Sequence, residues 1–475
     1  MLFNSYIFIF LFFPISLFGY FNINNLTFRK IWIILCSLYF YGYFNKIYIL
    51  IILVSIVFNY ICSFYMDIYK NIVIKRKILL FIALIFNIGL LGYYKYFNFF
   101  IENVNMVFGS NLFISKIVLP LGISFFTFQQ ISYVVDIYKE REKLPSIVDF
   151  AFFVSFFPQL IAGPIVLSKE MLPQIENEKN KIINYRHLMM GIYIFSLGLV
   201  KKVFLADTLA NFSEAGFDIM INLTTLEAWI TSLSYTLQLY FDFSGYCDMA
   251  YGIAIMFNIN LPINFNSPYK AKSISEFWQR WHITLGRFLK NYVYIPLGGN
   301  RKTEIITLRN LFLVFLTSGI WHGAGWNFIL WGVLHGIFII LDKIMEKYKI
   351  ITNNHKYIYI IKTFFTFNIV NILWIFFRAN NISQAFKIIK IMFNIKNIDL
   401  TLSTNFENAS AGFFHMSMII KILIFSLFVV FCSKNSFEKL KKIGFSHKMI
   451  LETTIYLILG ILFLDKVSKF LYFNF

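Results

Sequence analysis

Three histidines lie in apolar stretches that also contain tryptophan or glycine, namely His282, His322 and His335. An ionisable side chain at membrane depth is costly and marks a functional site by default. His322 is the strongest candidate, because Gly323 and Gly325 leave room for a substrate and a neutral imidazole can take a proton from a hydroxyl. The sequence therefore predicts His322 as a catalytic residue, whereas His335 is expected to pack between helices.

His282 lies in residues 276–301, a segment that mixes aromatic and cationic side chains. The nearby cations should disfavour the protonated form of His282, which suits a supporting role as a base or hydrogen-bonding group. As an alternative, the ring orients Trp278 or Trp281. Further candidates for substrate binding flank the two histidines: Trp281, Trp321 and Asn327.

The same segment carries three arginines that suit an anionic substrate. Arg280, Arg287 and Arg301 have forked donors that match phosphate oxygens, and Gly298-Gly299 allows a turn whose backbone N–H groups face an anion. We therefore predict a site for a phosphate-bearing substrate. The alternative is a helix that lies in the membrane interface and serves only as an anchor.

The composition predicts an all-α polytopic membrane protein. Of 475 residues, 58% are hydrophobic, 20% are aromatic and only 14% are charged, which excludes a soluble globular protein. Apolar runs along the whole length predict about ten to twelve membrane helices of roughly 20 residues each. Alternating strand patterns are missing, so an outer-membrane barrel is not expected.

The charge predicts contact with a membrane surface. The 43 Lys and Arg against 24 Asp and Glu give a net charge of +19, which in a membrane protein reflects orientation and anionic lipid headgroups; we predict membrane lipid and not nucleic acid as a partner. Basic residues near Arg29, Lys75–Lys77 and Lys139–Lys143 follow alternate spans, so the N-terminus is expected outside and these segments in the cytoplasm. Residues 1–28 are expected to form a retained first helix.

Two apolar segments should not form ordinary spans. The stretch from Asn310 to Leu341 has no charged residue and would measure about 48 Å as one helix, against a hydrocarbon core of about 30 Å. We predict a break at Gly323 to Gly325, with His322 in a protein-lined cavity. The helix that contains Met249 should end near Asn260, because asparagines and two prolines follow.

Other classes of chemistry find no support. The chain has no GxSxG, Walker, HExxH or Rossmann motif, and its four cysteines lie far apart, so no metal site is predicted. Asp136, Asp242 and Asp248 occupy apolar runs, and we expect them to bond between helices and to pair with the arginine-rich segment.

Taken together, the motifs resemble those of the membrane-bound O-acyltransferase family, and within it the bacterial alginate and peptidoglycan O-acetyltransferase branch. The resemblance covers roughly residues 30–390. It rests on residues 120–136, 157–164, 240–248 and 277–301, on Trp321-His322-Gly323 with Gly332, and on residues 374–379.

The resemblance implies a fold of membrane helices with short re-entrant or interfacial helices around a buried catalytic tunnel. It marks His322 as the catalytic residue and His282 as the second histidine of interest. The implied donor substrate is cytoplasmic acetyl-CoA, with no permanently bound cofactor. The acetyl group would cross the inner membrane to O-acetylate a cell-envelope polysaccharide, such as peptidoglycan or an alginate-like polymer, through an extracytoplasmic SGNH-type partner. His322 is then either a general base or itself acetylated.

Three rival readings stay open: a D-alanyl transferase for teichoic acid, a polytopic transporter or flippase, and a long-chain acyltransferase. We expect one membrane domain over 1–475. Its parts are N-terminal helices (1–116), a catalytic core (117–345) and C-terminal helices (346–475).

Overall fold

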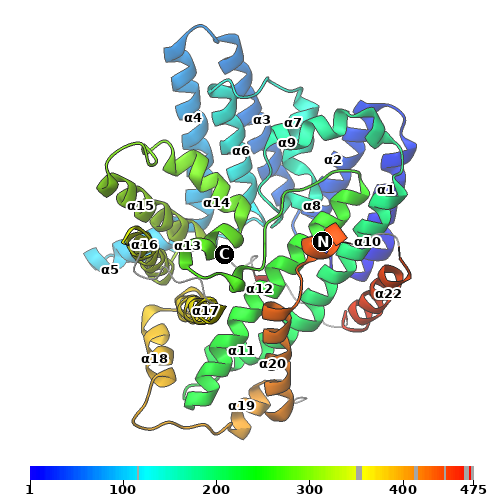
Figure 1. Ribbon diagram of the computed structural model, residues 1–475. Helices are drawn as coiled ribbons and strands as arrows, with labels where there is room; N and C mark the ends of the chain where they lie inside the picture. The colour runs from blue at the N-terminus through cyan, green and yellow to red at the C-terminus, as the bar shows by residue number, and fades with distance from the viewer. Residues whose placement is uncertain (115–116, 349–355, 411–415, 443–445, 465–469, 472–475) are drawn as a thin grey trace.

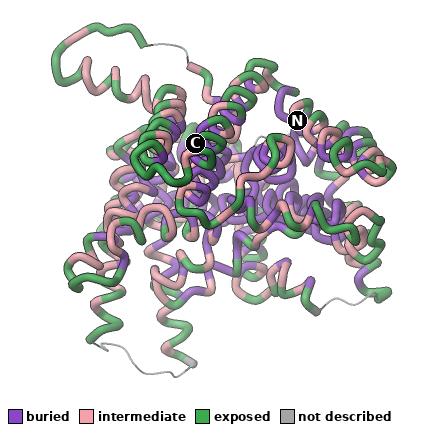
Figure 2. The backbone as a smooth tube through the Cα atoms, turned by 90° about the horizontal axis from the view of Figure 1, so that it is seen from above, coloured by how far each residue is buried: buried purple, intermediate pink, exposed green. Residues whose placement is uncertain are grey.

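The protein is a bundle of helices joined by irregular segments (Figure 1). The computed structural model describes residues 1–114, 117–348, 356–410, 416–442, 446–464 and 470–471, and this part contains no β-strand. Buried residues gather in the interior, whereas exposed residues, many of them large and apolar, lie around them (Figure 2). An apolar surface on a helical protein is the arrangement that lipid requires. The predicted all-α polytopic fold is confirmed.

The helices vary widely in length. The α-helices of the described residues are α1 (Phe13–Asn22), α2 (Leu26–Gly42), α3 (Ile47–Ile68), α4 (Val73–Leu91), α5 (Phe97–Phe108), α6 (Ile123–Tyr138), α7 (Ile147–Ser155), α8 (Phe157–Leu160), α9 (Ser168–Glu176), α10 (Tyr185–Val200), α11 (Asp207–Glu214), α12 (Thr225–Met256), α13 (Ile274–Arg280), α14 (Ile283–Leu289), α15 (Glu304–His322), α16 (Trp326–Lys347), α17 (Lys356–Arg378), α18 (Ile382–Met392), α19 (Thr404–Ala409), α20 (Met416–Cys432), α21 (Ser436–Lys442) and α22 (His447–Leu462). Wider π-helical turns adjoin some of them, among them η2 (Gly92–Tyr96) and η7 (Lys290–Tyr294).

Within the described residues, six helical stretches are long and apolar enough to cross a membrane, fewer than the ten to twelve expected. They are 47–68, 73–108, 185–219, 304–322, 326–347 and 357–378. The difference arises because other apolar stretches form short helices, such as α6 with 16 residues, or helices with many polar residues, such as α12. Backbone of this kind is stable at membrane depth when protein surrounds it.

The three basic segments near Arg29, Lys75 and Lys139 lie together at one end of the bundle. Arg76, in the first turn of α4, donates to the carboxylate of Glu140 just after α6 at 2.6 Å. Lys30, in the first turns of α2, pairs with Asp149 in α7. These ion pairs bring the segments close to one another, and their side of the membrane stays a prediction.

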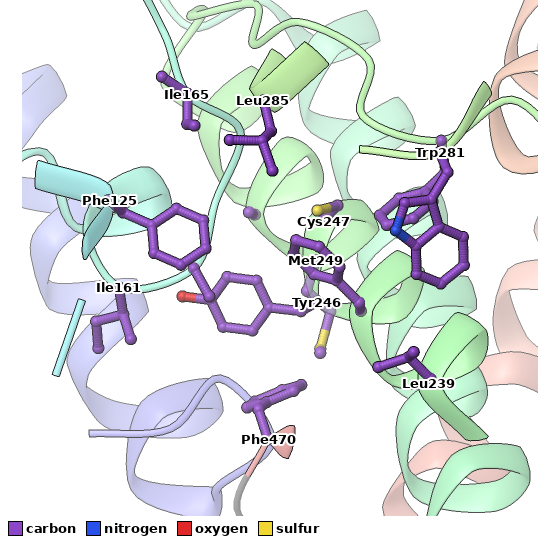
Figure 3. Packing of buried hydrophobic residues seen from close by; sticks show 14 of the residues in the cluster. Phe125, Ile161, Ile165, Leu239, Tyr246, Cys247, Met249, Trp281, Leu285 and Phe470 are labelled. Atoms are coloured by element: carbon purple, nitrogen blue, oxygen red, sulfur yellow. The ribbon is translucent and has the colours of Figure 1, made fainter. Parts of the chain in front are cut away.

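α12 runs through the middle of the molecule beside α10 (Figure 1). The two helices approach closely where glycines face each other: a methyl group at Gly198 would come within 2.6 Å of the Gly245 carbonyl oxygen. Tyr246 and Met249 of α12 point into the buried core (Figure 3). α12 ends at Met256, four residues before the predicted boundary near Asn260.

The buried aspartates of α12 form ion pairs with lysines and not with the arginine-rich segment. Asp242 accepts from Lys202 at 2.7 Å, and Asp248 accepts from Lys201 at 2.6 Å. Asp136 alone contacts the segment, since it accepts the hydroxyl of Tyr292 in η7 at 2.8 Å. The expected pairing with arginines 280–301 is therefore wrong for Asp242 and Asp248, because the folded chain places two lysines of the neighbouring helix nearer.

The long uncharged segment is broken where the glycines predict. α15 ends at His322 and α16 begins at Trp326, with Gly323 and Gly325 in extended conformations between them. The two helices then pack as a tight hairpin, because a methyl group at Gly319 would come within 2.9 Å of the Cα atom of Gly332. This hairpin places His322 in the buried interior, 3% exposed.

Candidate functional site

A cavity of about 570 Å³ opens between α13, α14, η7, α15 and α16. Its lining is mostly apolar, and its polar groups differ between the two ends. The exposed end carries Lys290, Glu304 and Lys343, whereas the inner end is formed by buried side chains that include His282 and Ser318. The cavity therefore leads from a charged mouth to a histidine inside the protein.

One face of α15 forms the inner wall of the cavity and continues toward His322. Leu311, Phe315 and Ser318 line the cavity at helical spacing, and His322 follows Ser318 by four residues. Residues four apart lie on the same face of a helix. His322 does not line the cavity itself but lies one turn beyond it on the same face.

The indole of Trp321 contacts both candidate histidines. Its ring centroid lies 4.7 Å from that of His322 and 6.4 Å from that of His282. Trp321 is itself fixed by stacking on Phe128 of α6, with ring centroids 5.0 Å apart. The predicted residues His282, His322 and Trp321 are thus brought together, with Trp321 in ring contact with both histidines.

His282 occupies an unusual backbone position at the start of α14. It has φ +45° and ψ +53°, a left-handed conformation that a non-glycine residue seldom adopts. Its Nδ1 lies 3.1 Å from Oδ1 of Asn264. Burial lowers the pKa of His282 to about 3, so the ring is neutral at physiological pH. The expected direction is confirmed, but burial and not the neighbouring cations causes the shift.

His322 lies in a box of aromatic rings at the broken end of α15. The ring centroids of Trp331 and Phe377 are each 5.1 Å from its own. The last carbonyls of α15 are capped from η2: Lys95 Nζ donates to the carbonyl oxygens of Trp321 and His322, the latter at 3.0 Å. A cation at this C-terminal end of α15 also interacts favourably with the negative end of the helix dipole.

His335 orients a wall of the cavity, as a packing residue of α16. It is fully buried, and its Nδ1 accepts the indole N–H of Trp278 at 3.1 Å. Trp278 lines the cavity. The alternative that His282 orients Trp278 is therefore replaced by His335 in this role.

Two of the three predicted arginines are engaged in ion pairs. Arg280 donates through Nη2 to Glu276 at 2.7 Å, one helical turn away in α13. Arg287 donates through Nη2 to Glu170 of α9 at 3.0 Å and to the Ile165 carbonyl oxygen at 2.9 Å. Neither lines the cavity. Both hold segments of the protein together in this structure.

The third arginine and its glycine turn lie near the mouth. Arg301 is exposed and follows Asn300, which lines the cavity. Gly298 and Gly299 have φ +108° and +58°, so the predicted turn is present. Their N–H groups, however, donate to backbone carbonyls of residues 295 and 294 at 3.0 and 2.9 Å. The turn therefore offers no N–H from these two glycines to an anion.

The remaining predicted binding residues, Trp281 and Asn327, contact other parts of the protein. Trp281 is buried and lies against Trp374 with ring centroids 5.1 Å apart, among the core side chains of Figure 3. Asn327, in the first turn of α16, donates to the Phe376 and Ala379 carbonyl oxygens at 3.3 and 2.8 Å. Neither lines the cavity; Asn327 instead joins the start of α16 to the end of α17.

Sequence reasoning did not single out four residues that the structure places at the site. They are Lys290 and Lys343 at the mouth, Asn264 beside His282, and Lys95 at the His322 carbonyl oxygen. Lysines are abundant along this chain, so two at the mouth of a cavity carry no local signal. Lys95 had one signal: it is the only charged residue between Lys77 and Glu102.

The central part of the chain matches a known family. Residues 121–380 match the membrane-bound O-acyltransferase family, a range that contains both candidate histidines, the cavity and the broken hairpin.

The chain is also similar to named proteins over its whole length or a large part of it. The peptidoglycan O-acetyltransferase of Helicobacter pylori is 42% identical, over an alignment that covers 100% of this chain and 98% of that protein. The probable alginate O-acetylase of Pseudomonas aeruginosa is 37% identical, covering 83% of this chain and 75% of that protein. The teichoic acid D-alanyltransferase of Bacillus subtilis is 27% identical, covering 50% of this chain and 61% of that protein.

Proposed function

Because this chain belongs to the membrane-bound O-acyltransferase family and is a multi-pass membrane acyltransferase, we propose that it transfers acetyl groups from cytoplasmic acetyl-CoA toward a cell-envelope polysaccharide. The observation that carries the proposal is the full-length similarity to a peptidoglycan O-acetyltransferase, at 42% identity. The acceptor is peptidoglycan or an alginate-like polymer, and the membrane is the inner membrane. A transporter or flippase is set aside, since the family consists of acyltransferases.

The cavity is suited to the donor. Its mouth carries Lys290 and Lys343, which supply positive charge for the phosphates of CoA, while the apolar interior accommodates the pantetheine arm. The mouth lies near the basic end of the bundle, since Tyr292 of η7 bonds Asp136 in the last turn of α6. Basic segments are expected in the cytoplasm, where acetyl-CoA is made.

The two histidines supply the proton chemistry. In the proposed reaction the oxygen of an acceptor hydroxyl attacks the thioester carbonyl carbon, and the carbon–sulfur bond breaks. His322 takes the hydroxyl proton as general base and returns it to the departing thiolate, so that the products are an acetyl ester and CoA thiol. His282, at the inner end of the cavity, provides a second proton-accepting group beside the thioester.

An extracytoplasmic partner completes the pathway. The polysaccharide lies outside the membrane, so the acetyl group leaves this protein on the side opposite the donor. We propose an SGNH-type acetyltransferase as the protein that receives it and delivers it to sugar hydroxyls. The C-terminal helices beyond residue 380 lie outside the family match, and the proposed reaction does not use them.

Reconstitution tests the proposal directly. Purified protein in lipid vesicles with its mouth accessible is given acetyl-CoA labelled in the acetyl group, together with an envelope polysaccharide and the candidate partner. We expect label on the polymer only when all three are present. Lack of label on polymer or partner, with intact protein, would overturn the acetyl assignment. Longer acyl-CoA esters serve as competitors that test for a long-chain acyltransferase.

A second candidate is D-alanyl transfer to teichoic acid, favoured by the 27% identity to a teichoic acid D-alanyltransferase over half of the chain. That similarity is lower and covers less of both proteins than the similarity to the O-acetyltransferases. Labelled D-alanine instead of labelled acetate in the wall polymer would support this candidate and contradict ours.

A further inference from the structure

The asparagine-rich loop between α12 and α13 enters the site through one residue, Asn264. Its side chain is 1% exposed, and its Oδ1 is approached by three groups. These are the backbone N–H of Thr284 at 3.2 Å, the Thr284 hydroxyl at 2.9 Å and Nδ1 of His282 at 3.1 Å. The Asn264 carbonyl oxygen also accepts the N–H of Ile283 at 3.0 Å. One loop residue therefore holds the whole start of α14.

The orientation of the Asn264 amide follows from its partners. A backbone N–H can only donate, so the side-chain atom that faces Thr284 N must be the oxygen. The Thr284 hydroxyl agrees, because it accepts the N–H of Ile165 at 3.0 Å and thus turns its own hydrogen toward Asn264. The amide nitrogen, on the other side, donates to Sγ of Cys247 at 3.3 Å.

The same oxygen decides where His282 carries its proton. An amide oxygen has no hydrogen to give, so Nδ1 of His282 at 3.1 Å from it must be the protonated nitrogen. A neutral imidazole has only one N–H, which leaves the lone pair on Nε2. We infer that Asn264 is a positioning residue that fixes His282 in the Nδ1–H tautomer and so makes Nε2 the proton-accepting atom at the inner end of the cavity.

The strained backbone at His282 supports the inference that the contacts from Asn264 hold this residue in place. The left-handed conformation at φ +45° is strained for a non-glycine residue and persists only where surrounding contacts hold it. The contacts that hold it are those of Asn264 to residues 282, 283 and 284. The backbone is thus turned so that the ring meets the amide oxygen. The catalytic meaning of this inference rests on the proposed function, whereas the tautomer itself does not.

The first experiment measures the tautomer without any substrate. Protein labelled with ¹⁵N-histidine is placed in lipid nanodiscs, and the His282 signals are assigned by their loss in His282→Gln. We expect a protonated Nδ1 and an unprotonated Nε2 in the wild type, and a mixture of tautomers or the reverse one in Asn264→Leu. A protonated Nε2 in the wild type, or an unchanged pattern in Asn264→Leu, overturns the inference.

The second experiment uses the acetyl-transfer rate as a function of pH. Asn264→Asp keeps the accepting oxygens but sets a carboxylate beside Nδ1–H, which raises the pKa of His282 and moves the acid limb of the profile up by about one to three pH units. Other titratable groups in this region are Cys247, which accepts from Asn264, and His322, which interacts electrostatically with His282; Lys290, Glu304 and Lys343 line the same cavity. An unmoved acid limb in an active, folded Asn264→Asp variant contradicts a role of His282 as proton acceptor.

Matched variants separate positioning from folding. Asn264→Leu should lower kcat by about 10²-fold or more while KM for acetyl-CoA stays within about twofold, because the donor's contacts at the mouth are untouched. Thr284→Val removes one donor but leaves the Thr284 N–H that orients the amide, so we expect a loss below about fivefold. Equal losses in both variants would mean that Asn264 only holds α14. If no variant, wild type included, transfers acetyl, the proposed function fails while the labelled spectra still decide the tautomer.

Discussion

The two candidate histidines are held in opposite ways. At the start of α14, His282 is held through its ring by the amide oxygen of Asn264, in a strained backbone conformation. At the end of α15, His322 follows an ordinary helix, its ring lies among aromatic rings, and the cap from Lys95 acts on its carbonyl oxygen. Polar contacts to a ring set its protonation state, whereas aromatic packing and a backbone cap set its place. From this difference we infer that the two residues have different roles.

The largest effect is expected for His322. Replacement by alanine should lower O-acetylation of the envelope by about 10² to 10⁴-fold as loss of a general base, and more completely if His322 carries the acetyl group. Protein level and membrane insertion should stay normal. The acetyl ester content of isolated wall polymer measures the loss of O-acetylation. The amount of the variant in the membrane fraction shows whether its level and insertion are normal.

The control for that variant is His335→Ala, which removes the acceptor of the Trp278 indole N–H. We expect it to lower thermal stability more than turnover. Wild-type acetylation by His322→Ala would show that the catalytic assignment is wrong.

His282 should show the next largest effect, and two variants separate ring from backbone. His282→Ala and His282→Gly both lose the imidazole and should lose activity alike, by less than His322→Ala does. Glycine adopts φ +45° without strain, so His282→Gly should be more stable than His282→Ala by about 1 kcal/mol. Thermal unfolding in detergent measures the difference. Equal stability would remove the argument that the backbone at this residue is strained.

Lys95 should have a smaller effect that concerns His322 alone. Lys95→Met removes the cap on the last carbonyls of α15, so we expect kcat to fall about tenfold with little change in KM for acetyl-CoA. Tyr96→Phe is the matched variant, since the Tyr96 hydroxyl donates only to the Ile320 carbonyl, further from the break. A greater loss for Tyr96→Phe would contradict a cap that acts on His322.

The smallest effect is expected at the cavity mouth. Lys290→Ala and Lys343→Ala should each raise KM for acetyl-CoA a few-fold, since an exposed charge contributes about 1 kcal/mol or less. Arg280→Ala is the comparison, because Arg280 pairs with Glu276 and does not line the cavity. Initial rates at varied acetyl-CoA and at two salt concentrations measure the difference. A larger change in KM for Arg280→Ala would restore the arginine as the phosphate-binding residue.

The features that could be predicted from sequence are those that depend on local chain chemistry. The break after His322 follows from two glycines in a segment too long for one span, and the end of α12 follows from asparagine and proline. The neutral state of His282 was also predicted, although for the wrong cause. Within the described residues, six helical stretches are long and apolar enough to cross a membrane, because several other apolar runs form shorter helices.

The partners of polar side chains could not be predicted in the same way. Arg280 and Arg287 pair with Glu276 and Glu170, and the latter lies more than a hundred residues away in sequence. That the two arginines bind substrate stays a prediction. The predicted binding residue Asn327 likewise bonds to α17.

By itself the sequence determined the class of the protein, the broken hairpin and the three histidines of interest, since hydrophobicity, glycine and proline act within a few residues. Only the tertiary structure decided which cations line the cavity, that Asn264 faces His282 and that Lys95 caps α15. Hydrogen bonds and ion pairs depend on distances of a few ångströms between segments far apart in the chain, and such distances arise only when the helices have packed.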